Sequence, residues 1–239
     1  MRIRVREHLL KNLEPKSTIL EINCGSGIDA VYFSKKGYVV HATDAAKGML
    51  VYVESKIISE KLKDNLTCEL LSFEKLNTLE GNKYNNVFSN FGGLNCISLS
   101  ALKSVINSFE ELLEPEGRVT LVIMPKICIW ELLKVFKGNK QAFRRVSNKT
   151  VLANVEGEEV PTYYHSAKQV KSFLSPNFTD FKVENICFFA PTGDRVDFPE
   201  RHPMLFRFLS SLDRLSNKIP FLQGYGDYYI ISAKKKIKK

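Results

Sequence analysis

The chain has no long apolar run and no apolar segment at its start. None of its 239 residues fall in a stretch of the roughly 18 consecutive apolar residues that a membrane-spanning helix needs. The first residues, Met-Arg-Ile-Arg-Val-Arg-Glu, have none of the apolar character of a secretory signal. From these absences we expect no membrane span and a cytoplasmic protein.

Cysteine is scarce, and its spacing has no regular pattern. The five cysteines stand at positions 24, 68, 96, 128 and 187, with no C-x-x-C pair and an odd count. This argues against a disulfide framework and against a structural zinc site, so we expect no bound metal. A reducing compartment is the ordinary setting for such a chain.

Acidic residues are outnumbered by basic ones, and the formal net charge is +9. Much of this charge is in the C-terminal lysines, at positions 234–236, 238 and 239, where we expect a solvated end. A second basic cluster, with no acid between residues 132 and 150, consists of Lys134, Lys137, Lys140, Arg144, Arg145 and Lys149. The chain has no zinc finger, no aromatic RNA-binding motif and no recognition-helix signature, which argues against a nucleic-acid partner.

Strand and helix patterns alternate along the chain and predict an α/β fold with a mostly parallel sheet. Apolar runs predict strands at residues 19–22, 38–44, 66–71, 85–89, 118–124, 178–189 and 227–233. Helical periodicity predicts helices at 3–13, 28–37, 45–61, 98–113, 167–174 and 204–216. The rhythm breaks at about residues 127–165, where we expect a helix at 127–136 and a hairpin of strands 150–155 and 158–164.

The stretch that organises the chain is residues 18–30, a strand, a glycine turn and a helix start. Glycines 25 and 27 leave room for a ligand to touch bare backbone, and the helix N-terminus offers free N–H groups. Residues 25–30 match the dinucleotide pattern G-x-G-x-x-G/A, so a nicotinamide dinucleotide is one candidate ligand. S-adenosylmethionine is the other, because Glu21 at the strand end would repel a pyrophosphate yet could hold a cationic amino-acid group.

Two further strand ends carry polar residues. Asp44 ends the second strand 17 residues after Gly27, near the spacing expected of a carboxylate that accepts ribose hydroxyls, and it could also cap the next helix. Asn90 and Phe91 follow the fourth strand and precede two glycines, which let backbone approach a ligand. Because ligands bind at the carboxyl ends of parallel strands, we expect these residues to meet.

The sequence from Glu21 to Gly27, followed by Ala42-Thr43-Asp44 and Met49, resembles the first two motifs of class I S-adenosylmethionine-dependent methyltransferases. Asn23 departs from the family pattern, which more often has a glycine there. The resemblance implies a Rossmann-like three-layer sandwich: one domain over residues 1–239, with a seven-stranded, mostly parallel sheet whose last strand is antiparallel. It implies S-adenosylmethionine as cofactor, bound by Glu21, Asn23, Gly25, Gly27, Asp44, Ala45, Met49, Ser72, Phe73, Asn90 and Phe91.

The family resemblance also suggests where an acceptor would bind. Insertions after the fifth strand often cover the acceptor pocket in this family, which makes residues 127–165 a candidate cap. His165 and Tyr164 are candidate catalytic residues on the acceptor side, His165 as a general base. The basic cluster favours an anionic small-molecule acceptor. The absence of N-P-P-Y after the fourth strand argues against base methylation. A nicotinamide-dependent oxidoreductase, a non-catalytic cofactor-binding scaffold and, less favoured, an RNA methyltransferase stay as alternatives.

Overall fold

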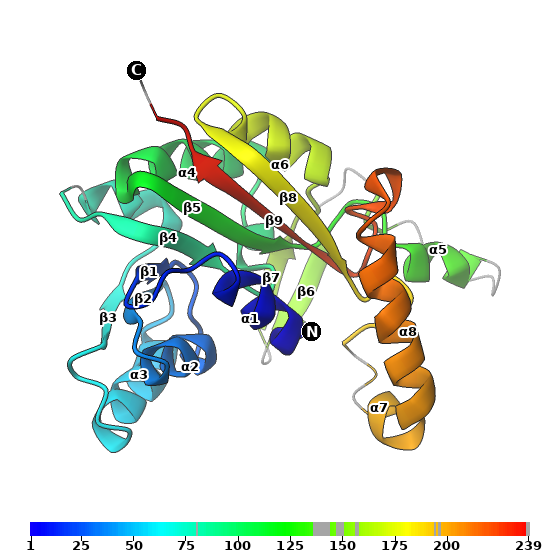
Figure 1. Ribbon diagram of the computed structural model, residues 1–239, viewed down its shortest axis with the longest axis horizontal. Coiled ribbons are helices and arrows are strands. Elements are labelled where there is room, and N and C mark those ends of the chain that lie inside the picture. Colours follow the sequence, from blue (N-terminus) through cyan, green and yellow to red (C-terminus); the bar gives the residue numbers. More distant parts are fainter. Residues whose placement is uncertain are drawn as a thin grey trace.

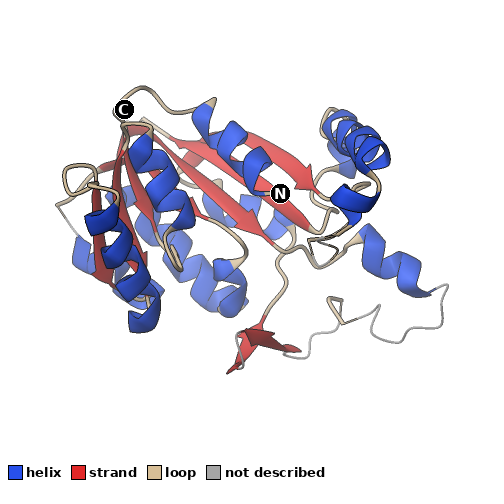
Figure 2. Cartoon of the chain, turned by 90° about the horizontal axis from the view of Figure 1, so that it is seen from below, coloured by secondary structure: helices blue, strands red, loops and turns tan. Residues whose placement is uncertain are grey.

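The computed structural model describes residues 1–79, 81–135, 144–146, 151–155, 158–193, 195 and 197–237. Within these ranges the chain forms one seven-stranded sheet flanked by helices and a separate two-stranded hairpin (Figures 1 and 2). No helix among the described residues is both long and apolar enough to cross a membrane. All five cysteines are described, and all are free.

The elements have the following bounds. The strands are β1 Thr18–Glu21, β2 Val39–Asp44, β3 Leu66–Leu70, β4 Tyr84–Ser89, β5 Leu113–Ile123, β6 Val151–Val155, β7 Glu158–Thr162, β8 Phe178–Ile186 and β9 Tyr228–Lys235. The α-helices are α1 Arg2–Leu10, α2 Ile28–Lys35, α3 Lys47–Ser59, α4 Leu99–Leu112, α5 Ile129–Val135, α6 Ala167–Leu174, α7 Phe198–Arg201 and α8 Pro203–Ser216. Short 3₁₀ turns are η1 Phe73–Leu79, η2 Gly93–Cys96 and η4 Pro220–Leu222.

The sheet has the strand order β3-β2-β1-β4-β5-β9-β8. Strands β1 to β5 pair in parallel, and β9 is antiparallel to both of its neighbours, β5 and β8. The predicted α/β fold with an antiparallel last strand is therefore confirmed. The chain reverses its direction of travel across the sheet between β1 and β4, and such a reversal opens a crevice at the carboxyl ends of those two strands.

Helices cover the sheet on both faces, because neighbouring strand residues alternate between two cores (Figure 1). Leu20 and Val87 pack on one side in a core that includes residues of α4 and α6. Ile19 and Phe88 point to the other side, into a core that includes residues of α1, α2 and α3. The strands are apolar on both faces, as expected of a parallel sheet buried between helices.

Two helix starts follow from the local sequence. The hydroxyl of Ser98 accepts a hydrogen bond from the backbone N–H of Ala101, so Ser98 caps α4. Ser166 caps α6, and the side chain of Gln169 reaches back to the Ser166 backbone in a full capping box.

The fifth strand differs from the sequence expectation. The sequence pattern predicts a strand at 118–124, but β5 begins at Leu113 and includes residues 114–117. The register with β4 shifts between Tyr84 and Asn86, and Glu116 has a positive φ of 64°. The Pro–Glu–Gly segment is therefore accommodated as an irregularity within the strand, where the chain bends without leaving the sheet.

The segment at about residues 127–165, which interrupts the alternation of strands and helices, is described in part. Helix α5 and the hairpin of β6 and β7 are present, and the hairpin forms its own sheet (Figure 2). Lys137, Lys140, Lys149 and the expected turn at Glu156-Gly157 lie outside the described residues, as do Lys238 and Lys239. The role of this segment as a cap over an acceptor pocket stays a prediction.

Candidate functional site

A cavity of about 210 Å³ lies where β1 and β4 end. Strand β1 ends at Glu21, strand β4 at Ser89, and the first turn of α2 lies next to both exits. The cavity is lined by Arg2, Glu21, Asn23, Cys24, Gly25, Ser26, Ile28, Asp29, Asn90, Phe91 and Gly93. It therefore lies in the crevice that the sheet topology predicts.

Glu21 lines the cavity at the end of β1. Its side chain is buried, and its Oε2 atom has no hydrogen-bond partner among the described residues. Burial, and next the neighbouring Asp29 carboxylate, raise the pKa of Glu21 well above the ordinary value of 4.5. A cationic group placed in the cavity would favour the ionised carboxylate and satisfy the unpartnered oxygen.

Asp29, a residue that the sequence interpretation did not select, forms several side-chain hydrogen bonds in the cavity wall. It lies buried in the first turn of α2 and accepts hydrogen bonds from three side chains. Arg2 contacts Oδ2, Arg6 Nε lies 2.8 Å from Oδ1, and Asn90 Nδ2 lies 2.7 Å from Oδ2. The guanidinium of Arg2 also lies 4.2 Å from the ring centre of Phe91. These contacts hold α1, α2 and the β4 exit together around the cavity.

Asn23 fills the place where the family more often has a glycine. Its Nδ2 donates to the Asn90 carbonyl at 2.7 Å, and its Oδ1 accepts from the Ser89 hydroxyl at 2.5 Å. A Cβ atom on Gly93 would lie 2.3 Å from Asn23 Nδ2, so the second glycine of the pair makes room for this side chain. Asn23 thus joins the ends of β1 and β4.

Asp44 orients the glycine turn and the start of the next helix. Its Oδ2 accepts from the Gly25 N–H at 2.8 Å, and its Oδ1 accepts from the Ala46 N–H at 2.9 Å. A Cβ atom on Gly25 would meet nothing within 4 Å, so open space lies beside this backbone. The carboxylate remains half-buried, which leaves lone pairs for a ligand. Its contact to ribose hydroxyls stays a prediction.

The structure places the predicted cofactor residues in two groups. Five of them line the cavity: Glu21, Asn23, Gly25, Asn90 and Phe91. The others lie outside its lining: Gly27, Asp44, Ala45, Met49, Ser72 and Phe73. The lining residues that sequence reasoning missed are Arg2, Cys24, Ser26, Ile28, Asp29 and Gly93. For Arg2 the sequence did contain a signal. Arg2 and Arg6 are four residues apart on α1, which places both guanidiniums on one helix face.

His165 and Tyr164 lie outside the cavity lining. The His165 ring is buried, its Nε2 lies 3.2 Å from the Ile97 carbonyl oxygen, and burial lowers its pKa to about 4. A nitrogen that donates to a carbonyl has no free lone pair for a proton. The ring of Tyr164 lies 5.1 Å from the guanidinium carbon of Arg145. His165 therefore contacts Ile97 and Tyr164 contacts Arg145. The catalytic roles of both residues stay predictions.

Comparison with known proteins gives a domain match over part of the chain. Residues 19–117 match the family model described as a methyltransferase domain. This segment includes every predicted cofactor residue. No curated protein matches the chain.

Solved structures share the fold over nearly the whole chain. A proposed S-adenosylmethionine-dependent methyltransferase from Listeria monocytogenes is 17% identical with a TM-score of 0.66, covering 99% of this chain and 100% of its own. A SAM-dependent methyltransferase from Methanosarcina mazei is 16% identical with a TM-score of 0.63, covering 97% and 98%. The [4+2]-cyclase SpnF is 12% identical with a TM-score of 0.60, covering 98% and 82%, so fold alone does not fix the reaction.

Residues 19–117 therefore contain a methyltransferase domain, which is an enzyme domain, and the strand order and the position of the cavity agree with the fold of the similar solved structures. S-adenosylmethionine is the cofactor that the Listeria and Methanosarcina structures are named for. The residues present fit this cofactor, because the unpartnered, buried Glu21 oxygen faces a cavity that suits a cationic amino-acid group.

Proposed function

We propose that the chain transfers the S-adenosylmethionine methyl group to a small-molecule acceptor by in-line displacement at the sulfonium methyl. The observation that carries the binding mode is the buried Glu21 carboxylate, whose Oε2 has no partner among the described residues. A carboxylate in this state would pair favourably with the ammonium group of the cofactor's methionine end.

The charge of the cavity supports a sulfonium cofactor over a nicotinamide dinucleotide. Of the two buried carboxylates that line it, Asp29 is paired with Arg2 and Arg6, whereas Glu21 has an Oε2 atom with no partner among the described residues. A pyrophosphate at the α2 N-terminus would have to lie beside the Glu21 carboxylate, which disfavours it in a buried site. The G-x-G-x-x-G/A match at residues 25–30 therefore does not by itself support a dinucleotide.

The mechanism assigns binding and alignment to the side chains of this chain. When bound, the cofactor supplies an electrophilic methyl group that needs no further activation. Glu21 would hold the amino group, Asp44 would accept the ribose hydroxyls, and Phe91 would form a wall beside the sulfonium. Alignment of two reactants in a dry site can supply roughly 7–11 kcal/mol of the barrier reduction.

The structure removes one reason to expect an anionic acceptor, namely the charge of Arg144 and Arg145. Arg144 Nη2 lies 2.6 Å from Glu131 Oε1, and Arg145 Nη2 lies 2.6 Å from Asp227 Oδ1. Both guanidiniums that favoured an anion are therefore paired within the protein. We propose an acceptor that is a nucleophile at neutral pH, because the His165 Nε2 atom is engaged with a backbone carbonyl. Five free cysteines support a reducing, cytoplasmic setting.

A screen with radiolabelled methyl donor tests the proposal. The purified chain is incubated with labelled S-adenosylmethionine and a panel of small oxygen, nitrogen and carbon nucleophiles, with RNA as a separate arm. We expect label transfer to a small molecule and loss of that transfer in the Asp44→Ala variant. Transfer to RNA alone, or equal transfer by the variant, would refute the acceptor class or the role of Asp44 respectively.

A further inference from the structure

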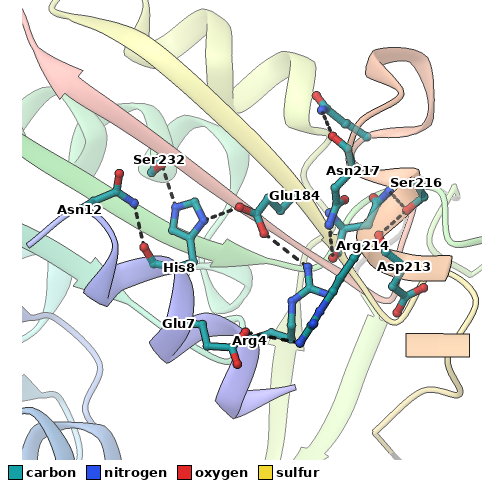
Figure 3. Close-up of polar contacts among 12 residues, drawn as sticks. Arg4, Glu7, His8, Asn12, Glu184, Asp213, Arg214, Ser216, Asn217 and Ser232 are labelled. Atoms are coloured by element: carbon teal, nitrogen blue, oxygen red, sulfur yellow. Dashed lines mark hydrogen bonds and ion pairs between the residues drawn. The ribbon is translucent and has the colours of Figure 1, made fainter. Parts of the chain in front are cut away.

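A second hollow lies on the face of the sheet that carries α1. It is a groove of about 680 Å³ between α1, β8 and the C-terminal end of α8 (Figure 3). This volume falls within the range of small-molecule sites. The lining of the groove shares no residue with that of the cofactor cavity, so the two hollows are distinct.

The groove is strongly basic. Its lining contains five basic side chains, Arg4, Lys11, Lys182, Arg214 and Lys218, and two acidic ones, Glu7 and Glu184. Both acids are already paired, Glu184 with Arg4 at 3.4 Å and Glu7 with Arg214 at 3.8 Å. The groove therefore keeps an excess of positive charge.

Three lysines carry this excess. Lys182 Nζ lies 3.0 Å from the neutral Asn12 amide oxygen, and among the described residues no carboxylate forms an ion pair with it. Lys11 and Lys218 are exposed, and neither forms an ion pair with a carboxylate in the described part of the chain. Lys11 caps the C-terminal end of α1 and Lys218 lies in the turn after α8, so these two lysines approach the groove from different elements.

The wall behind these charges is held by buried contacts. His8 Nδ1 lies 2.8 Å from Glu184 Oε1 and His8 Nε2 lies 2.9 Å from Ser232 Oγ, which ties α1 to β8 and β9 (Figure 3). The Asn185 amide oxygen accepts backbone N–H groups of residues 224, 225 and 226, which holds the turn that follows α8. The groove is thus largely preformed.

We propose that this groove binds a phosphate-bearing small molecule. Lysine and arginine donors on two sides suit several phosphate oxygens at once. The two acids, Glu7 and Glu184, interrupt the positive surface, which disfavours a continuous nucleic-acid strand. The bounded volume also favours a compact anion over a polymer.

Calorimetric titration with inorganic tripolyphosphate tests the site on the full chain, with and without saturating S-adenosylhomocysteine. The groove variant is Lys11→Glu with Lys218→Glu. Its matched control is Lys63→Glu with Lys168→Glu, which changes the net charge equally at exposed positions that do not line the groove. A third variant, Lys11→Arg with Lys218→Arg, keeps the local charge.

We expect the groove variant to bind tripolyphosphate about tenfold more weakly or worse, because two charge-assisted contacts are lost. The control and the arginine variant should bind within about twofold of the unmodified chain, and added S-adenosylhomocysteine should leave the affinity unchanged. Equal weakening in the control, no binding to the unmodified chain, or competition by S-adenosylhomocysteine would overturn the proposal. So would tighter binding of a short single-stranded RNA that depends on the same lysines.

Discussion

At the scale of single residues, the cofactor cavity depends on two buried carboxylates with opposite surroundings. Asp29 accepts hydrogen bonds from Arg2, Arg6 and Asn90. Glu21 keeps one oxygen without a partner among the described residues. A buried acid without full compensation costs stability, and such a cost is typical of a group that is reserved for a ligand.

Replacement of Glu21 by Gln tests this difference. In the folded protein the pKa of Glu21 is raised well above the ordinary value of 4.5. The folded protein therefore keeps a proton that the unfolded chain loses, and its stability falls as pH rises from 4.5 through the folded-state pKa. Relative to wild type, the Gln variant should gain about 1–3 kcal/mol of stability between pH 5 and pH 8. Thermal unfolding of both proteins without cofactor, at a series of pH values, measures the difference.

The same variant should bind S-adenosylhomocysteine at least about tenfold more weakly, because a neutral amide cannot replace an ion pair with the ammonium group. The gain in stability over wild type should be larger at pH 8 than at pH 5. If it is not, and if the variant binds S-adenosylhomocysteine with wild-type affinity, Glu21 is a structural residue only.

At the scale of elements, α1 is fixed by one carboxylate on each side. Arg2 and Arg6, four residues apart, contact Asp29 of α2. Arg4 and His8, also four residues apart, contact Glu184 of β8. Between these two faces, Val5 and Leu9 are fully buried in the core. The helix is therefore a wall shared by the cofactor cavity and the basic groove.

Glu184→Gln should weaken the attachment of α1 in a pH-dependent way. The hydrogen bond from His8, then the His8 charge and after it the Arg4 charge, lower the pKa of Glu184 to about 2 against the opposing effect of burial. The stabilisation is present above about pH 4.5 and is lost as pH falls towards 2. With a side chain that is 30% exposed, we expect roughly 1–2 kcal/mol after solvent screening.

Urea unfolding at pH 7 and at pH 3 measures this effect. The exposed Glu74, which lies in η1 and lines neither hollow, provides the matched Glu→Gln control. A Glu184 variant with the same loss at both pH values would contradict the electrostatic origin of the attachment.

At the scale of the whole molecule, a buried ion pair joins two distant parts of the chain. Arg145 belongs to the segment that interrupts the α/β rhythm, and Asp227 immediately precedes β9. Arg145 Nη1 also donates to the Asp227 carbonyl at 2.9 Å, and its side chain is only 5% exposed. Arg145, which belongs to the basic cluster that favoured an anionic acceptor, thus connects the insertion to the sheet.

Arg145→Ala should destabilise the protein by about 3–5 kcal/mol, because it removes a buried cation that contacts both the Asp227 and the Glu131 carboxylates. Arg144→Ala is the control: its side chain is 43% exposed, so we expect a loss of about 1 kcal/mol or less. Denaturant unfolding of the two variants gives the comparison. Equal losses would mean that the buried pair with Asp227 carries no special weight.

Much of the architecture could be predicted because it depends on local patterns. Apolar runs marked all seven strands of the main sheet, and glycines with polar strand ends marked the crevice of Glu21 and Asn90. The bend of β5 at Glu116 could not be predicted, because a Pro–Glu–Gly segment is equally typical of a turn. The partners of Asp29 and Arg145 are distant in sequence, and only the fold brings them together.

Calorimetric titration of the purified chain with S-adenosylhomocysteine, and in parallel with NAD, tests the central claim most directly. We expect saturable S-adenosylhomocysteine binding with one site per chain and no NAD binding, because the cavity holds the buried Glu21 carboxylate with its unpartnered oxygen. Binding of NAD, or no heat with S-adenosylhomocysteine, would contradict it.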